Sequence, residues 1–443
     1  MGIGTFKGGV HPYDGKELAK NEPIVELKPT GEMVFPVSQH IGAPATPVVS
    51  VGDSVLRGQK IAEAGGFVSA PVFSSVSGTV KAIEPRRVAT GDMVMSIVIE
   101  SDGNFIETGY NEVDDVSKLS RDEIIGRIKD AGIVGLGGAG FPTHVKLSPK
   151  DPDKIDYIIV NCAECEPYLT SDYRRMVENP EMVVAGLEIM VSMFPNATGV
   201  FGVEDNKPDC IAKFNELIKD KPRLKVQPLL TKYPQGGERQ LIHAVTGRDL
   251  NSKMLPADVG CIVDNVETVC SIYMAVKQGK PLMHQIFTVT GDMAKKPCNY
   301  LIYLGTSYKE ILEAAGGVKG DVAKYVSGGP MMGFALFDLD VPTTKTASAI
   351  LCMSKDEASM YETTACINCG RCVEACPENL IPSRLADYAE HGQDEEFEKW
   401  YGLECIECGS CSYGCPARRH LAQAIRTKKK TILAAKRAAA AKK

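Results

Sequence analysis

The sequence predicts a multidomain protein that combines α+β and α/β units, and three observations support this fold class. Its 443 residues are too many for a single hydrophobic core. Short Val- and Gly-rich runs fill the N-terminal part, whereas strand and helix patterns alternate over the middle of the chain. A cysteine pattern then occurs twice, at 366–377 and 405–416. We therefore expect four successive units and a short tail.

The composition favours a soluble, cytosolic protein. Apolar residues make up 44% and charged residues 24%, and the net charge is −6. No basic stripe runs through the body of the chain, which argues against nucleic acid as the main partner. No run approaches the ~18 apolar residues that cross a bilayer, and the N-terminus lacks the apolar segment of a signal peptide. We expect a chain that stays in the cytosol and can still dock on a membrane-embedded partner.

Residues 1–110 are expected to form a β domain. Two segments, TPVVSVGDSVLRGQKIAEAG and SSVSGTVKAIEP, alternate strand-like runs with Gly-containing turns. Their pattern resembles the barrel-sandwich hybrid fold of biotinyl and lipoyl domains. The lysine that those carriers modify is missing, because residues 67–69, before the Ala-Pro pair, read Phe-Val-Ser. The resemblance therefore implies a structural module and not a swinging-arm carrier.

Residues 111–280 are expected to form an α/β domain. Ser120 and Glu123 make a capping box that opens a helix ending near Asp130. A buried-strand run follows at 155–161, and helices and strands then alternate to about residue 230. Such alternation is typical of a mainly parallel sheet covered by helices.

Residues 281–345 read as two strands, a helix that ends at Gly316–Gly317, and a further strand. This ββαβ unit resembles the soluble-ligand-binding β-grasp (SLBB) domain, and its ligand stays open. Met331 and Met332 are expected to fill its core.

Residues 346–425 hold two copies of the pattern C-x2-C-x2-C-x3-C-P. Three thiolates at this spacing wrap one cluster, and the fourth ligates the cluster of the other copy. The pattern predicts two [4Fe–4S] clusters rather than paired structural zinc sites, which usually separate two C-x2-C pairs by a longer gap. Two helices expected between the copies resemble the helical ferredoxin module of larger oxidoreductases. The predicted ligands are Cys366, Cys369, Cys372 and Cys415 for one cluster, and Cys376, Cys405, Cys408 and Cys411 for the other.

The stretch GLGGAGFPTHVK at 135–146 lets backbone N–H groups approach a phosphate or a flat ring. The string resembles a loop of the NADH-binding flavoprotein subunit of respiratory complex I. Three further segments match that family in the same order: NCAECEP from 161, YPQGGE from 233 and DNVET from 264. The resemblance implies that this domain binds FMN and takes NAD(H) as its substrate.

Carried over position by position, the resemblance implies a role for each site residue. The glycine backbone, a lysine cation and hydrogen-bonding side chains would hold FMN, whereas an aromatic ring and polar residues would line the NADH site. The FMN residues are Gly137, Gly138, Gly140, Lys146, Asn161, Glu164 and Asn265. The NADH residues are Phe141 on the adenine side, Glu166, Gly236, Glu238 and, packed nearby, Tyr233.

Four positions depart from the complex I family, which has Arg, Asp, Glu and Asn there: Leu136, Ala163, Gly237 and Asp264. These changes remove polar contacts. Two alternatives follow, a looser flavin site with altered nucleotide affinity and a flavin-free electron adaptor. Cys162 and Cys165 are expected to be buried small apolar residues, and His144 and His243 to be packing or surface residues.

The order of the four units resembles the RnfC component of the Rnf-type electron transport complex over nearly the whole chain. This implies a peripheral subunit at the cytoplasmic face of the cell membrane that passes electrons between NAD(H), FMN and both clusters, towards partner subunits and ferredoxin. Translocation of Na⁺ or H⁺ would belong to the partners. The NADH-oxidising subunit of a soluble flavin-based assembly is the alternative.

Residues 426–443 form a tail with eight Lys or Arg and no acidic residue. Its many Ala residues favour a helix. The charge suits an anionic membrane leaflet or an acidic partner face, and a solubilising tail is the alternative.

Overall fold

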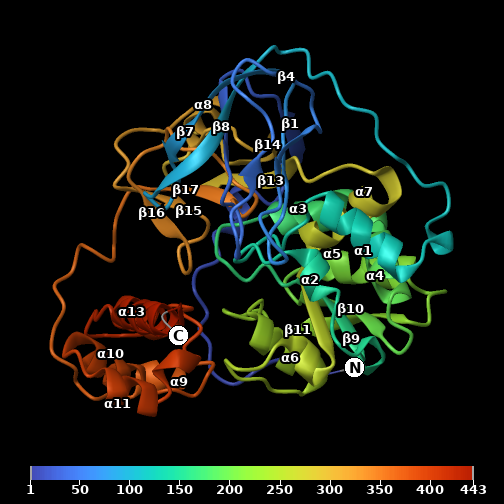
Figure 1. Cartoon of the computed structure of the whole chain (residues 1–443). Helices are drawn as coiled ribbons and strands as arrows, with labels where there is room; N and C mark the ends of the chain where they lie inside the picture. The colour runs from blue at the N-terminus through green and yellow to red at the C-terminus, as the bar shows by residue number, and fades with distance from the viewer. Residues whose placement is uncertain (1, 442–443) are drawn as a thin grey trace.

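The computed structural model describes residues 2–441, and Figure 1 shows a β-rich part, an α/β part and a separate helical module near the C-terminus. Met1, Lys442 and Lys443 lie outside the described residues. Lys442 and Lys443 are the last two positions of the predicted tail. Within residues 2–441 the strands form four sheets. This arrangement confirms the predicted multidomain fold class. In the same part of the chain, no helix combines the length and the apolar character that a membrane span requires.

Seven short strands make up the N-terminal β unit: Glu32–Pro36 (β2), Thr46–Pro47 (β3), Ser54–Val55 (β4), Lys60–Glu63 (β5), Val72–Phe73 (β6), Gly78–Arg87 (β7) and Met93–Ser101 (β8). One antiparallel sheet has the order β2-β8-β7-β4, and a smaller sheet has the order β3-β5-β6. Met33 and Phe35 alternate along β2 and are buried with Ile61, Ile97 and Ile99 in one core. The period of two in β2 is what places both side chains on the inner face.

A parallel sheet forms the centre of the α/β part. Its strands are Tyr157–Cys162 (β9), Thr198–Glu204 (β10), Leu224–Leu229 (β11) and Cys261–Asn265 (β12). Their order is β11-β10-β9-β12, and every pair is parallel. The carboxyl ends of β9 and β12 therefore meet at one edge of the sheet, where ligands bind in open α/β folds.

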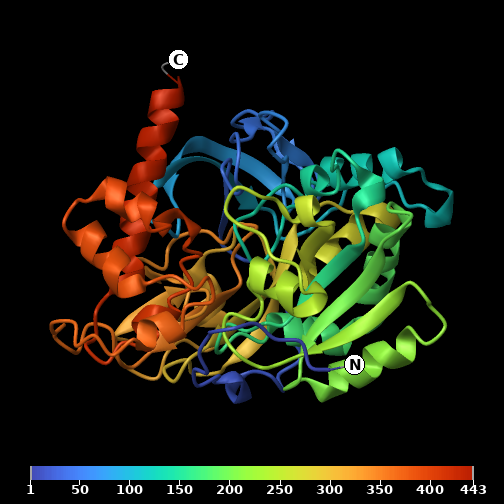
Figure 2. The same cartoon turned by 90° about the horizontal axis from the view of Figure 1, so that it is seen from below.

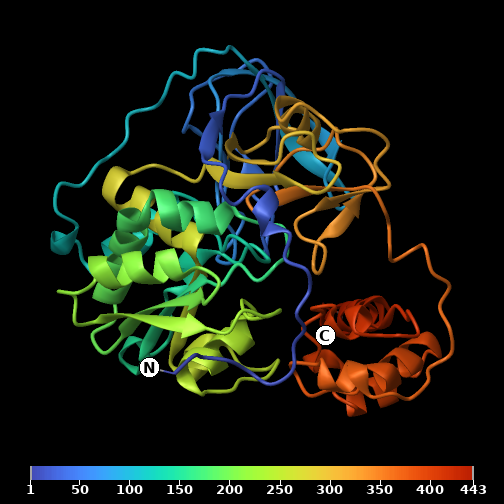
Figure 3. The same ribbon diagram turned by 180° about the vertical axis from the view of Figure 1, so that it is seen from behind.

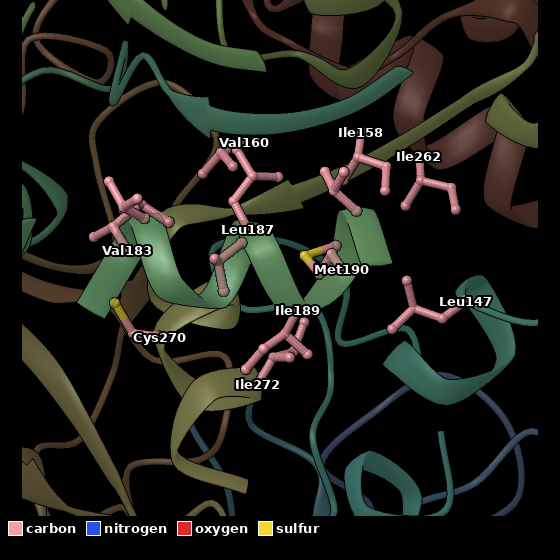
Figure 4. Packing of buried hydrophobic residues seen from close by; sticks show 14 of the residues in the cluster. Leu147, Ile158, Val160, Val183, Leu187, Ile189, Met190, Ile262, Cys270 and Ile272 are labelled. Atoms are coloured by element: carbon pink, nitrogen blue, oxygen red, sulfur yellow. The ribbon is translucent and has the colours of Figure 1, made fainter. Parts of the chain in front are cut away.

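The helices of this part are Arg121–Asp130 (α1), Thr143–Lys146 (α2), Ser171–Glu178 (α3), Pro180–Ser192 (α4), Pro208–Leu217 (α5), Glu238–Thr246 (α6) and Val266–Gln278 (α7). The predicted capping box of α1 is present, with Ser120 N donating to Glu123 Oε2 at 2.7 Å. Both faces of the sheet are covered. Val183 and Leu187 of α4 lie with Ile158 in one core (Figure 4). Leu241 of α6 lies with Ile159 in another core. Neighbouring residues of a strand face opposite sides, so both faces of β9 are apolar.

A six-stranded mixed sheet contains the predicted ββαβ unit. Its elements are Ile24–Leu27 (β1), His284–Thr290 (β13), Cys298–Tyr303 (β14), Tyr308–Ala314 (α8), Lys324–Ser327 (β15), Phe334–Leu336 (β16) and Ala349–Met353 (β17). The strand order is β1-β14-β13-β17-β15-β16. Two strands come from outside the predicted limits of 281–345: β1 pairs with β14, and β17 fits between β13 and β15. Both strands satisfy backbone groups that the ββαβ unit alone leaves unpaired.

The helical module consists of Arg371–Glu374 (α9), Pro382–Glu390 (α10), Asp394–Lys399 (α11), Ser410–Tyr413 (α12) and Leu421–Ala441 (α13). The two helices predicted between the cysteine repeats are α10 and α11. Helix α13 starts before the predicted tail, and its residues Ile425 and Ile432 are buried in the core of the module. Lys428 pairs with Asp394 at 2.6 Å. Figure 2 shows α13 projecting from the module, so the tail continues a packed helix.

The N-terminal segment of residues 2–20 runs between the α/β part and the helical module (Figure 3). Gly4 N donates to Pro228 O at 2.8 Å, beside the end of β11. Further along, Val10 N donates to Tyr233 O at 2.8 Å, and Gly9 N donates to Ala375 O at 3.0 Å. The segment thus ties the two parts together.

Candidate functional site

Two hollows in the helical module are each lined by four cysteines, together with other residues. Cys366, Cys369, Cys372 and Cys415 line the first, and Cys376, Cys405, Cys408 and Cys411 line the second. Each hollow takes three cysteines from one repeat and the fourth from the other, as the spacing predicts. Within residues 2–441, no three His, Cys, Asp or Glu side chains converge as they do around a single metal ion. Four thiolates spread around a hollow form the donor set of a [4Fe–4S] cluster, so the residues present fit this group.

The two repeats share one backbone conformation. Asn368 and Glu407, each two residues after the first cysteine of their repeat, have φ values of 54° and 61°. Gly370 and Gly409 follow with φ values of 77° and 81°, and α9 and α12 begin directly after them. Left-handed residues turn successive N–H groups into a concave site, which suits a group with negative charge. The glycine of each copy is visible in the sequence, whereas nothing there indicated the left-handed Asn368 and Glu407.

The glycine-rich loop lies against the start of α7. Leu136 N donates to Thr268 Oγ1 at 2.8 Å, and the Leu136 side chain is buried in the core. Gly137 has φ 72°, and a Cβ there would lie 3.2 Å from Asn265 Nδ2. A Cβ on Gly138 would meet no heavy atom of the described residues within 4 Å. The loop therefore leaves open space at Gly138, which fits a cradle for a flat cofactor.

Lys146 lies in a buried charge cluster beside this loop. Its Nζ donates to Val263 O at 2.6 Å and to Asp264 Oδ1 at 2.9 Å. Burial alone would lower the pKa of Lys146, but the nearby carboxylates of Asp264 and Glu238 outweigh it and raise the pKa. The structure thus brings Lys146, Asp264 and Glu238 together.

Asn161 and Gly236 are joined at the end of β9. Asn161 Nδ2 donates to Gly236 O at 2.8 Å, and Gly236 N donates to Cys165 Sγ at 3.2 Å. Cys162 is fully buried, as expected. Cys165 is half-buried, and its Sγ accepts the hydrogen bond from Gly236 N. Burial raises the pKa of both thiols, which keeps them protonated and inert.

Glu164 and Asn265 meet through the start of α3. The Glu164 carboxylate accepts hydrogen bonds from Asp172 N at 2.7 Å and Tyr173 N at 3.3 Å. Asn265 Oδ1 caps α7 by accepting from Glu267 N, and Asn265 Nδ2 donates to Asp172 Oδ2 at 2.7 Å. Burial raises the pKa of Asp172 to about 8. Sequence reasoning missed Asp172, because no motif covers it and only its contact with Asn265 identifies it.

The Glu166 carboxylate holds the loop at 328–333. It accepts hydrogen bonds from Met332 N at 2.6 Å and Met331 N at 3.3 Å. The Met332 side chain is 48% exposed and Met331 is only partly buried, so the prediction that they fill the core is wrong. Met331 and Met332 contact the Glu166 carboxylate through their backbone N–H groups and not through their side chains.

Glu166 is expected to make stability depend on pH. Burial raises its pKa from 4.5 to about 7, even though the N–H groups of Met331 and Met332 oppose the shift. A raised carboxyl pKa contributes stability that is complete below pH 4.5 and is lost as the pH rises through 7. We expect the unfolding free energy to fall by about 1 kcal/mol between pH 6 and pH 8 from this group. Anaerobic urea unfolding of the wild type and Glu166→Gln checks this, and equal pH slopes in the two proteins would contradict it.

Gly140, Phe141 and His144, three further residues discussed from the sequence, each have a different structural role. Gly140 packs tightly, since a Cβ there would lie 3.0 Å from Thr346 Cγ2. Phe141 is half-buried and closes the glycine-rich loop, its O accepting from Gly135 N at 2.8 Å. His144 is buried with its Nε2 3.2 Å from Phe67 O, as a packing residue.

Tyr233 connects the two kinds of site. Its ring is fully buried, and its Oη donates to Cys408 O at 2.7 Å. Nearby, Arg239 Nη1 pairs with Glu378 Oε2 at 2.6 Å. His243, on the same helix as Arg239, is exposed. The residues around Tyr233 therefore contact the loops of the second hollow directly.

The fold and these sites define a flavin- and iron–sulfur-containing electron-transfer protein. Four family models match the chain: an RnfC barrel sandwich hybrid domain at 4–104, a Nuo51 FMN-binding domain at 128–274, an SLBB domain at 286–335 and a 4Fe-4S dicluster domain at 365–419. The chain accordingly carries an FMN-binding domain and a domain for two iron–sulfur clusters. The paired-zinc alternative is set aside.

Similar proteins give the family. The RnfC-type component of the Na(+)-translocating ferredoxin:NAD(+) oxidoreductase complex of Acetobacterium woodii is 45% identical over 98% of both chains. Its counterpart in the proton-translocating complex of Clostridium ljungdahlii is 44% identical over 90% of this chain and 87% of its own. The chain belongs to the RnfC family of ion-translocating ferredoxin:NAD(+) oxidoreductase complexes. An NAD+-reducing [NiFe]-hydrogenase structure has a TM-score of 0.51 at 19% identity, over 72% of this chain and 65% of its own, which shows likeness of fold alone.

Proposed function

We propose that the chain transfers electrons between NAD(H) and two [4Fe–4S] clusters through FMN, as a peripheral subunit at the cytoplasmic face of a membrane-bound, ion-translocating complex. Its partners are the other subunits of that complex and ferredoxin. Movement of Na⁺ or H⁺ belongs to those partners. When bound, FMN supplies the link between two-electron hydride transfer and one-electron transfer.

One observation carries this proposal: the flavin-site region and the second cysteine hollow share a contact. Tyr233 Oη reaches Cys408 O at 2.7 Å, and both groups are buried. The second hollow is thus the one next to the flavin site. In the first hollow Cys366 and Cys369 are exposed, which leaves this side accessible to a partner. Electrons would run through the buried hollow and leave or enter through the exposed one.

The chain's own residues prepare the site for the cofactor. Gly137 and Gly138 would give the backbone close access to FMN, and Asn161 and Asn265 would supply amide groups. Lys146 stays charged and would lie beside the flavin or its phosphate, with Asp264 as its counter-charge. Phe141, Glu166, Gly236 and Glu238 would contact NAD(H), as the resemblance implies. Gly140 and Glu164 support the loop and helix α3 around this site.

Anaerobically purified full-length chain tests the proposal. We expect about one extractable FMN and about eight irons per chain, and bleaching of the flavin and cluster bands on addition of NADH. Recovery with membranes after cell lysis would separate this function from that of a soluble flavin-based assembly. About eight irons without flavin, and no response to NADH, would leave an electron adaptor fed by another subunit.

Gly138→Val is expected to weaken FMN binding at least tenfold without unfolding the chain. A Cβ at this position has no described heavy atom within 4 Å, so the added side chain is expected to obstruct a ligand in that space rather than the protein itself. Gly126→Val in α1 is the matched control, because a Cβ there also has no described heavy atom within 4 Å. Fluorescence quenching of FMN titrated with apoprotein gives the affinity, and thermal unfolding reports the fold. Equal FMN affinity in the Gly138→Val and Gly126→Val variants would contradict the placement.

A further inference from the structure

Asp264 has a buried carboxylate in which one oxygen accepts a hydrogen bond and the other has no hydrogen-bond partner among the described residues. It is the last but one residue of β12, directly before Asn265, and is 1% exposed. Oδ1 accepts from Lys146 Nζ at 2.9 Å, whereas Oδ2 is buried and has no hydrogen-bond partner among the described residues. Leaving a charged oxygen buried without a donor is costly, so native proteins rarely do it without a functional reason. Its ion pair with Lys146 places the carboxylate beside the expected FMN site.

Asp264 also changes the charge of that site. The complex I family, by resemblance, has an uncharged Asn where this chain has Asp264. Here the Asp264 carboxylate cancels the charge of Lys146, and Glu238 adds a further negative charge nearby. A reduced flavin carries more electron density than an oxidised one, and protein charge near the ring tunes its electronics. A site without net positive charge therefore holds the reduced form less tightly.

We propose that Asp264 lowers the reduction potential of the bound flavin by neutralising Lys146. This inference rests on the proposed function, because it requires FMN in the site. A lower flavin potential favours exchange of electrons with strongly reducing one-electron carriers. The Asn-to-Asp departure is then a tuning of the site and not a loss of a flavin contact.

The Asp264→Asn variant of the full-length chain tests the proposal. We expect the ratio of reduced to oxidised flavin at a fixed potential to rise at least tenfold, which is a positive shift of about 30 mV for a two-electron couple. Spectroelectrochemical titration of the flavin band measures this, with the cluster bands as internal reference. Asp249→Asn, which removes a carboxylate that is 84% exposed, is the matched control and should leave the potential unchanged.

Two further variants make the test decisive. Asp264→Glu keeps the charge and should keep the low potential. Lys146→Met should lower the potential in the wild type and at least as much in the Asp264→Asn background, where no carboxylate offsets the lysine charge. An unchanged potential in Asp264→Asn overturns the proposal, and so does loss of FMN binding by more than a hundredfold, since Asp264 would then serve retention. Absence of FMN from the wild type is a separate result and defeats the proposed function itself.

Discussion

Cys376→Ala is expected to remove one whole cluster and to lower the iron content from about eight to about four atoms per chain. Cys376 lines the same hollow as Cys405, Cys408 and Cys411, although it belongs to the other repeat in sequence. Without the thiolate of Cys376 only three cysteine ligands remain for this cluster, and the protein no longer holds it. The cluster lost is the one beside Tyr233. NADH should still reduce the flavin, but the surviving cluster should be reduced far more slowly.

The mirror variant Cys415→Ala separates the two clusters. It removes the exposed cluster and leaves the one next to Tyr233, so NADH should reduce the survivor as fast as in the wild type. Iron analysis and stopped-flow absorbance under nitrogen give both quantities. Cys298→Ala, at a half-buried cysteine of β14, is the control and should keep all iron. If NADH reduced the surviving cluster of Cys376→Ala as fast as it reduces the clusters of the wild type, the cluster beside Tyr233 would not be the first to receive electrons from the flavin.

Glu267→Ala is expected to destabilise the α/β part by about 3–5 kcal/mol. Arg175 Nε donates to Glu267 Oε2 at 2.6 Å and Arg175 Nη2 donates to Oε1 at 2.9 Å, with both side chains almost fully buried. Removing the carboxylate leaves the guanidinium charge buried and unpaired, which costs more than the pair itself contributes. The backbone N–H of Glu267, which donates to Asn265 Oδ1, is kept in this variant, so the expected loss comes from the unpaired guanidinium.

Native-state hydrogen exchange of α7 amides measures this loss within a multidomain chain, where a single unfolding transition is not assured. Lys154→Ala, which breaks an exposed pair with Asp151, should change stability by less than about 1 kcal/mol. The double variant Arg175→Met, Glu267→Leu should recover much of the loss, because it leaves no buried charge. If the double variant were as unstable as Glu267→Ala, cavity formation and not the unpaired charge would explain the effect.

Local sequence determined much of this protein. The spacing C-x2-C-x2-C-x3-C-P led to the grouping of cysteines that the two hollows show, because a short loop limits which sulfurs can share a cluster. The capping box at Ser120 and Glu123 marked the start of α1, since its bonds span only three residues. Alternating strands and helices indicated the parallel sheet of β9 to β12 for the same reason: periodicity within an element is written in consecutive residues.

The packing of the whole chain sets which distant groups meet. Nothing near Glu166 in sequence indicates that its carboxylate binds the loop at 328–333, and nothing near Lys146 indicates its pairing with Asp264. Strand β1 joins a sheet whose other members lie more than 250 residues away, because an open strand edge accepts any segment the fold brings to it. Such contacts depend on how the whole chain packs, and their charges act through space and not along the sequence.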